Sequence, residues 1–152
     1  EINNILSKNI KRVAIYRVAL AFPPKMLLDD HRVLADLING GLNKKVVTLN
    51  GGANLIRQYQ YGLNAIYKIL GSLYAGDSIL YNNSGSHILT LAELAECVAS
   101  ILKVDCIIND KNKDTTSPKA VLIDNSLINR ESSYDERRED SLEDYLRSMI
   151  NA

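Results

Sequence analysis

The chain has 152 residues, among them 18 basic and 18 acidic side chains, and its formal net charge is zero. A chain of this length forms one domain and buries about 70% of the surface that its unfolded state exposes. The neutral balance gives no general attraction to nucleic acid or to a membrane surface. Its apolar runs are shorter than the roughly 20 residues of a membrane-spanning helix. We therefore expect a soluble, cytoplasmic protein without nucleic-acid or membrane partners, in which Cys97 and Cys106 are free thiols rather than a disulfide.

The first residues have the composition and period of a helix end. Ile2, Ile5 and Leu6 lie on one helical face, and the chain does not begin with methionine. We interpret residues 1–10 as the end of a truncated preceding helix. Residues 11–152 are expected to form a single α/β domain, because strand and helix patterns alternate along them.

A strand, a loop and a helix begin this domain. Arg12–Arg17 is nearly all apolar between its two arginines, which predicts a strand buried on both faces. Two prolines in Ala19–Leu28 predict a loop. The helix that follows is capped by Asp29 or Asp30 and is expected to end at Gly40-Gly41. Its apolar positions recur at helical spacing: Val33, Leu34, Leu37 and Ile38.

The stretch from Lys44 to Asn64 is the one in which we expect function to reside. Val46–Leu49 predicts a short strand, Gly51-Gly52 a turn, and Arg57–Tyr61 a second strand that forms a pair with the first. On the second strand the arginine and two tyrosines share one face, and two glutamines share the other. Tyrosines on a strand face are more often core residues than platforms for a nucleotide base.

Helices and strands continue to alternate through the second half. The helix after Asn64 is expected to turn four apolar residues inward: Ile66, Ile69, Leu70 and Leu73. Ser78–Asn82 predicts a strand and Asn83–Ser86 a polar turn. Thr90 and Glu93 form a capping box, in which each side chain bonds an otherwise unpaired backbone N–H group. That helix is expected to end near Leu102.

The helices and strands predicted in the C-terminal part are shorter than those before, and charged residues are more frequent there. Val104–Ile108 predicts a strand, and Asn109–Pro118 a solvated loop. Lys119–Ile123 predicts a further strand, followed by Asp124 as the cap of a short helix. The last helix, Leu142–Ile150, has acidic residues in its first turn, as the helix dipole favours.

The ordered set of these motifs resembles the C-terminal half of an extended short-chain dehydrogenase/reductase, and more narrowly the nucleotide-sugar epimerases, dehydratases and decarboxylases. The resemblance covers about residues 11–130 and is nearly without gaps from Lys44 to Asn64. The matching positions are Arg17, Pro24, Asp30, Arg32, Val33, Gly51, Arg57, Tyr59, Tyr61, Tyr81, Asn82, Gly85, Thr90, Glu93, Leu94 and Asp124. It implies an α/β fold: the substrate-binding portion of such an enzyme, lacking most of the Rossmann nucleotide-binding domain.

Several positions depart from the pattern of that family. Pro23 replaces a glycine, Gly62 and Asn64 replace a valine and an aspartate, and Gly85 comes one residue late. The glycine-rich turn Gly-x-x-Gly-x-x-Gly, which binds the dinucleotide pyrophosphate, is missing from the 152 residues. None of the eight tyrosines has a lysine four residues on, so the catalytic Tyr-x-x-x-Lys pair is missing too. The resemblance therefore assigns no catalytic residue and no cofactor-binding residue to this chain.

The substrate-binding roles of the family carry over to a few residues. Arg57 matches the arginine that binds the substrate diphosphate, because a guanidinium offers phosphate a rigid fork of donors. Lys111 is the nearest counterpart of a second phosphate-binding arginine, and it lacks the bidentate geometry. Asn82 matches a residue near the sugar pocket of some dehydratases, or is only a strand-end turn residue. The segment lining the base and ribose is matched by Thr48, Leu49, Asn50 and Gly51.

Two functions of different class remain open. One is the nucleotide-sugar-binding half of an NAD- or NADP-dependent epimerase or dehydratase, inactive alone, in which NAD(P) binds only the full-length parent and not this fragment. The other is a non-catalytic binding or interaction domain derived from the same family. Homo-oligomerisation also stays open. No group of Cys, His and Asp has metal-ligand spacing, so no metal is expected.

Overall fold

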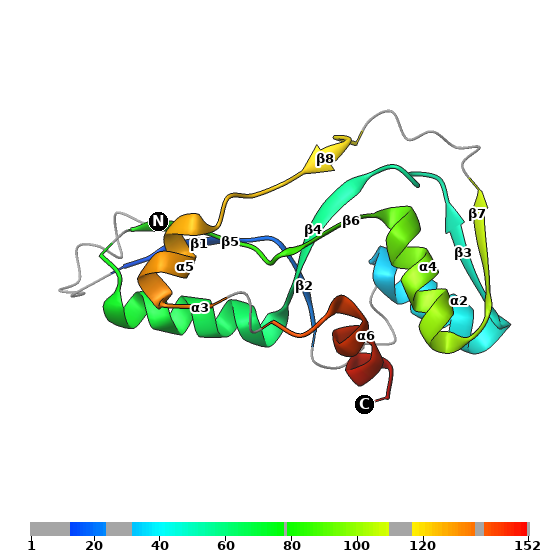
Figure 1. The fold of residues 1–152 in the computed structure, drawn as a ribbon. Coiled ribbons are helices and arrows are strands. Elements are labelled where there is room, and N and C mark those ends of the chain that lie inside the picture. Colours follow the sequence, from blue (N-terminus) through cyan, green and yellow to red (C-terminus); the bar gives the residue numbers. More distant parts are fainter. Residues whose placement is uncertain (1–12, 24–31, 78, 110–116, 136–138, 152) are drawn as a thin grey trace.

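The computed structural model describes residues 13–23, 32–77, 79–109, 117–135 and 139–151 and shows a mixed α/β fold (Figure 1). Residues 1–10, expected to be a helix end, lie outside these ranges. The elements in chain order are β1 (Ile15–Val18), β2 (Leu20–Phe22), α2 (Val33–Lys44), β3 (Val46–Asn50), β4 (Ile56–Tyr61), α3 (Gly62–Ala75), β5 (Leu80–Asn83), β6 (His87–Thr90), α4 (Leu91–Leu102), β7 (Asp105–Asn109), β8 (Ala120–Val121), α5 (Ser126–Ser132) and α6 (Leu142–Asn151).

The described strands form three small sheets. β1 pairs with β5 and β3 pairs with β7, both in parallel. Between them, β4 pairs with β2 and β8 in parallel and with β6 antiparallel. Figure 1 shows β1, β5, α3 and α5 at one end of the molecule and β3, β7, α2 and α4 at the other. The central strand β4 therefore joins two lobes.

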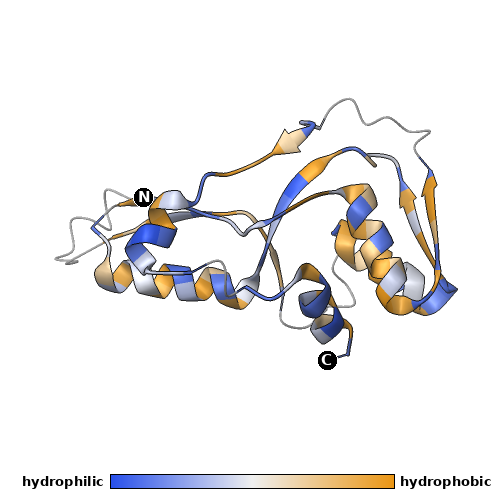
Figure 2. Ribbon diagram, viewed as in Figure 1, coloured by the Kyte–Doolittle hydropathy of each residue, from blue (hydrophilic) through white to orange (hydrophobic). Residues whose placement is uncertain are grey.

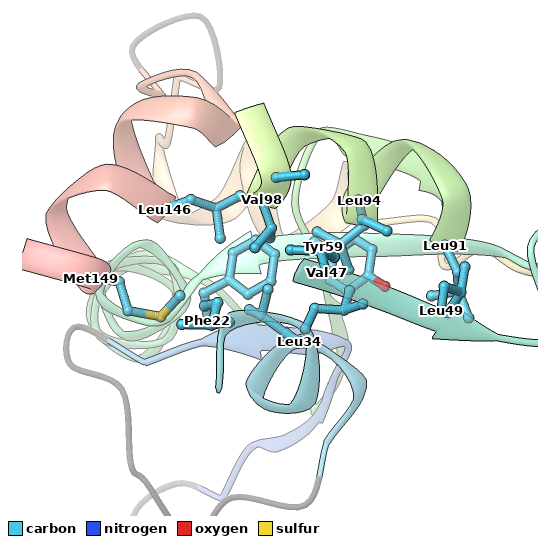
Figure 3. Packing of buried hydrophobic residues seen from close by; sticks show 14 of the residues in the cluster. Phe22, Leu34, Val47, Leu49, Tyr59, Leu91, Leu94, Val98, Leu146 and Met149 are labelled. Carbon is cyan, nitrogen blue, oxygen red and sulfur yellow. The ribbon is translucent and has the colours of Figure 1, made fainter. Parts of the chain in front are cut away.

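The apolar core lies in the lobe that contains α2, α4 and β3 (Figure 3). Leu37, Val47, Leu94 and Val98 are each at most 1% exposed. The aromatic ring of Phe22 on β2 stacks on the ring of Tyr59 on β4. Helix α6 adds Leu146 and Met149 from a third side (Figure 3). Burial of this apolar surface is the main stabilising term of the lobe.

A set of buried polar side chains, here called the polar seam, lies on β4, on α3, and at the end of β5 with the residue after it. Its members are Gln58, Gln60, Lys68, Ser72, Asn83 and Ser84, all nearly inaccessible to solvent. Three of them bond the backbone that links β5 to β6: Gln60 Nε2 donates to Asn83 O at 2.8 Å, Lys68 Nζ to Ser84 O at 2.8 Å, and Gln58 Nε2 to Gly85 O at 2.7 Å. These side chains replace the strand pairing that the connecting backbone lacks.

The predicted pairing of Val46–Leu49 with Arg57–Tyr61 is wrong. Both segments are strands, but β3 pairs with β7 and β4 belongs to the central sheet. After β3 the chain continues along β7, because Gly51 N donates to Asn109 O at 2.8 Å. The two strands therefore diverge at the glycine turn instead of folding back as a hairpin.

The prediction that Gly40-Gly41 ends the first described helix is also wrong. α2 continues to Lys44, and Lys45 caps it in the left-handed conformation with φ of 58°. A Cβ atom on Gly41 would lie 2.4 Å from a methyl group of Leu102 on α4. This glycine is therefore explained by the close approach of two helices and not by helix termination. The predicted caps, Asp29 and Asp30, lie outside the described residues.

The orientation predicted for α3 is reversed. Ile66, Leu70 and Leu73 are 51%, 57% and 40% exposed, and Ile69 is half-buried. The inward face carries Ala65 and two polar residues of the seam instead. Apolar residues recur along the whole of α3 in Figure 2. The inward face is small because α5 lies against it: a Cβ atom on Gly71 would approach Ser132 O to 2.8 Å.

Two further differences concern the strands. β1 lies over Ile15–Val18, and both of these end residues are more than one-third exposed, so the prediction of a strand buried on both faces is wrong. β2 and β6 fall in segments that were predicted to be loop or were given no element. Both pair with β4, a partner that is distant in sequence. By contrast, α4 begins and ends as predicted, and its capping box at Thr90 and Glu93 is present.

Candidate functional site

Arg57 lies near the start of β4, between two neighbouring strands. Its register partners are Leu89 on β6 and Val121 on β8. One Nη atom of its guanidinium donates to Ile56 O at 2.8 Å and to Pro118 O at 3.1 Å. Within the described ranges, its other N–H groups make no hydrogen bond. Pro118 thus holds one side of the guanidinium and leaves a fork of donors for an anion.

The environment of Arg57 is partly apolar. Tyr59, two residues along the same strand face, is buried and stacks on Phe22 with the ring centroids 5.0 Å apart. Burial raises the pKa of Tyr59, and the positive charge of Arg57 opposes this rise. Tyr61 stacks on Tyr145 of α6, with centroids 4.6 Å apart. Both tyrosines therefore serve in packing, Tyr59 within the buried core and Tyr61 partly buried against it, as the prediction of core residues had it.

The predicted base-lining segment, Thr48–Gly51, ends β3 and begins the glycine turn. The Asn50 Oδ1 atom accepts a hydrogen bond of 3.1 Å from Nδ2 of Asn109, the last residue of β7. Gly51 has φ of 85°, in the region that favours glycine. The pair of asparagines lies at the carboxyl ends of two parallel strands, the edge at which open α/β sheets bind ligands.

The structure does not bring all predicted site residues together. Asn82 lies on β5, paired with Arg17 of β1. Figure 1 places β5 and β3 at opposite ends of the molecule, so Asn82 and the asparagine pair do not share one site within the described chain. Lys111 lies outside the described residues. The remaining candidate set is Arg57 with the segment Thr48–Gly51.

Two residues that contribute to this site could not be identified from the sequence. Asn109 carries no motif; only its position at the end of a strand parallel to β3 brings its amide to Asn50. Pro118 acts through its backbone carbonyl, which has no signature in the sequence. In both cases the information lies in strand pairing between residues about 60 positions apart: Asn50 and Asn109, and Arg57 and Pro118.

Across the ranges that the structure describes, the other chemical groups do not form a second candidate site. Among the described residues there is no cluster of three or more His, Cys, Asp or Glu side chains suited to a metal ion. Cys97 and Cys106 are free, and burial raises the pKa of both thiols. In the described part of the chain, no helix is both long enough and apolar enough to cross a membrane.

No protein-family model and no curated protein sequence matches this chain. Its structure is similar to that of UDP-glucuronic acid 4-epimerase from Bacillus cereus in complex with UDP-glucuronic acid and NAD, with a TM-score of 0.78 and 20% identity over 97% of this chain and 47% of that one. UDP-N-acetylglucosamine 4-epimerase from Methanobrevibacter ruminantium gives a TM-score of 0.79 and 18% identity over 99% of this chain and 48% of that one. For dTDP-glucose 4,6-dehydratase from Bacillus anthracis in complex with NAD the values are 0.71 and 16%, over 91% and 43%.

These likenesses define the fold. The chain has the mixed α/β fold found in extended short-chain dehydrogenases/reductases, as the resemblance in the sequence implied. It spans about half the length of the solved structures that it matches. The three structures named are two nucleotide-sugar epimerases and one dehydratase, and two of them were solved in complex with NAD.

Proposed function

We propose that this chain is the nucleotide-sugar-binding half of an NAD(P)-dependent epimerase or dehydratase and is not catalytically competent alone. The observation that carries the proposal is the geometry of Arg57. Pro118 O fixes one side of its guanidinium. The other N–H groups of the guanidinium have no hydrogen-bond partner among the described residues. In this role Arg57 binds the diphosphate of a nucleotide sugar, and the segment Thr48–Gly51 contacts the base and ribose.

The fold supports this assignment because its structural neighbours include enzymes crystallised with UDP-sugars and NAD. The 152 residues contain neither the glycine-rich turn that fits a dinucleotide pyrophosphate nor a Tyr-x-x-x-Lys pair. They therefore do not fit NAD, and no hydride or proton step is assigned to them. In the proposal this chain contributes binding and orientation of the substrate only.

Exposed apolar surface supports a larger assembly in the proposed enzyme. β1 has β5 as its single strand partner among the described residues, and the outward face of α3 is apolar. Parallel sheets normally have both faces covered by helices. In the proposed enzyme, the edge of β1 and the face of α3 would pack against the half that binds NAD.

Thermal unfolding with added ligands tests the proposal. A ligand that binds only the folded state raises its stability by mass action. We expect UDP, dTDP or GDP sugars to raise the melting temperature of the wild type, and Arg57→Ala to lose that rise. Arg147→Ala removes a surface positive charge on α6 and serves as the matched control. Uridine should bind equally to the wild type and to Arg57→Ala, since it lacks the diphosphate.

The alternative is a non-catalytic binding domain that kept the fold. The departures at Pro23 and Asn64 favour it, and Asn64 now has a structural role: its Nδ2 donates to the Tyr145 hydroxyl at 2.7 Å. No stabilisation by any of the nucleotide sugars, or an equal one in Arg57→Ala, would refute the proposed phosphate site and favour this alternative.

A further inference from the structure

The sequence contains two Asn-Gly dipeptides with nearly the same neighbours. One lies in Ile38–Gly41, with the sequence INGG, and the other in Leu49–Gly52, with the sequence LNGG. Deamidation is least hindered where glycine follows asparagine, because glycine has no side chain to obstruct attack by its own backbone nitrogen on the asparagine amide. The two dipeptides therefore have the same intrinsic chemistry, and only the fold distinguishes them.

The first dipeptide lies inside a helix. Asn39 and Gly40 belong to α2, which continues beyond them. An α-helix fixes the backbone angles of its residues and uses their N–H groups in bonds to the preceding turn. Both residues are half-buried, and their neighbours Ile38 and Gly41 are buried. Attack by Gly40 N on the Asn39 side chain therefore requires this part of α2 to unfold.

The second dipeptide lies where β3 ends. Asn50 is the last residue of β3 and is exposed, and Gly51 begins the turn with φ of 85°. Gly51 N donates to Asn109 O at 2.8 Å, and Asn109 Nδ2 donates to Asn50 Oδ1 at 3.1 Å. Asn50 and Asn109 are the last residue pair in the register of β3 and β7, two strands that lie side by side at one end of the molecule (Figure 1). One residue of β7 thus holds both residues of the dipeptide.

These two hydrogen bonds, here called the latch, oppose deamidation in different ways. The first uses the N–H group of Gly51, whose nitrogen has to become the nucleophile. The second holds the side-chain amide of Asn50, which has to be attacked. Ring closure also requires the backbone of Asn50 to leave the extended conformation of a strand. Both asparagines of the latch are exposed, so their separation does not require a buried side chain to move.

We propose that Asn50-Gly51 is a deamidation site of the folded chain, controlled by the latch to Asn109, and that Asn39-Gly40 is not. The end of a two-stranded ladder opens locally at a lower free energy than a helix packed in the core. The latch therefore opens while α2 stays folded. This inference does not depend on the proposed nucleotide-sugar site.

The reaction needs only water and base. Once the latch is open, Gly51 N loses its proton to solvent and attacks Asn50 Cγ. The N–Cγ bond forms and the Cγ–Nδ2 bond breaks, and Nδ2 takes a proton from solvent and leaves as ammonia. Water then opens the succinimide at either carbonyl, which gives aspartate or isoaspartate. In isoaspartate the main chain is one carbon longer, so Gly51 N–H no longer lies in register with Asn109 O and the latch cannot close as before.

Incubation of the full chain at pH 8, followed by tryptic digestion and mass spectrometry, tests the proposal. Trypsin releases the two dipeptides on separate peptides, Val33–Lys44 and Val46–Arg57. We expect Asn50 to deamidate at least about tenfold faster than Asn39 in the folded chain, because the latch opens without α2. In urea, the two rates should lie within about twofold of each other, since the neighbours are nearly the same. A sample digested without incubation gives the background.

The variant Asn109→Ala tests the latch itself. It removes the donor to Asn50 Oδ1 and leaves the backbone acceptor for Gly51 in place. We expect the rate at Asn50 to rise about fivefold, which is the effect of one lost hydrogen bond, while the rate at Asn39 stays within about twofold. Asn54→Ala removes an exposed asparagine side chain from the same turn. It is the matched control and should change neither rate.

Three results would overturn the proposal. The first is a rate at Asn50 no higher than that at Asn39 in the folded chain, which would mean that both react through global unfolding. The second is no deamidation of Asn50 in the folded chain while the chain in urea is converted, which would mean that the latch stays closed. The third is an unchanged rate at Asn50 in Asn109→Ala, or an equal rise in Asn54→Ala. Should Asn109→Ala fail to fold, the first two comparisons decide, because they use the wild type alone.

Discussion

Gln58 offers a direct test of the polar seam. Its Nε2 donates to Gly85 O at 2.7 Å, and its Oε1 accepts from Ile123 N at 2.8 Å, so one side chain satisfies two backbone groups from different segments. Gln58→Met keeps the length of the side chain but leaves both backbone groups without this partner. Each unsatisfied buried group costs about 1–3 kcal/mol, so for the two groups we expect a loss of about 2–6 kcal/mol in the free energy of unfolding.

Gln60 is the matched control because it lies on the same face of the same strand and is also buried. Its Nε2 donates to Asn83 O, but its Oε1 has no hydrogen-bond partner among the described residues. Gln60→Met therefore removes one bond and also one unpaired acceptor, and we expect a loss of only about 1 kcal/mol. Urea unfolding of both variants, with the slope of the transition checked, measures the difference. An effect of Gln58→Met no larger than that of Gln60→Met would refute the account of the seam.

Four further predictions concern local features. Thr90→Ala should cost about 1 kcal/mol in urea unfolding, because it removes the N-cap of α4. Bonds from the backbone and hydroxyl of Thr90 hold the pKa of Glu93 below its usual value. Glu93 therefore stabilises the fold above the ordinary carboxyl pKa, and this contribution is lost as pH falls. The loss of unfolding free energy in Glu93→Gln at pH 7 should shrink toward pH 4, and a loss that stays constant with pH would contradict this. Gly85→Ala should prevent soluble expression, since its Cβ would lie 2.2 Å from a carbonyl oxygen of β4. Cys97 and Cys106 should react with iodoacetamide at pH 8 more slowly in the folded chain than in urea, because burial raises the pKa of both thiols; equal rates would contradict the burial seen here.

Features set by neighbouring residues were predictable from the sequence. The capping box of α4 depends on two residues three positions apart, and both hydrogen bonds are present. The α/β class and the position of most helices follow from local period. The assignment of Arg57 to a strand beside a glycine turn also follows from local pattern, and the chain lies in the fold that the ordered motifs implied.

Features set by distant partners were not predictable in this way. The glycine at position 41 signals termination when read locally, but its role is to let α4 approach α2. The apolar period of α3 identifies a helix and one apolar face, but it does not say whether this chain covers that face. Arg57 could be found by resemblance, whereas Pro118 and Asn109 reach the candidate site only through parallel pairing.

The polar seam has a consequence for how this chain tolerates substitution. An apolar core accepts many exchanges of similar volume, because its contacts have no direction. In the seam, the side-chain amides of Gln58 and Gln60 donate to backbone carbonyls, which no mutation can replace. A change in one of these side chains therefore cannot be compensated by a change in its partner. The position of residues 83–85 against β4 is thus fixed by these two donors and should vary less than the surrounding sequence.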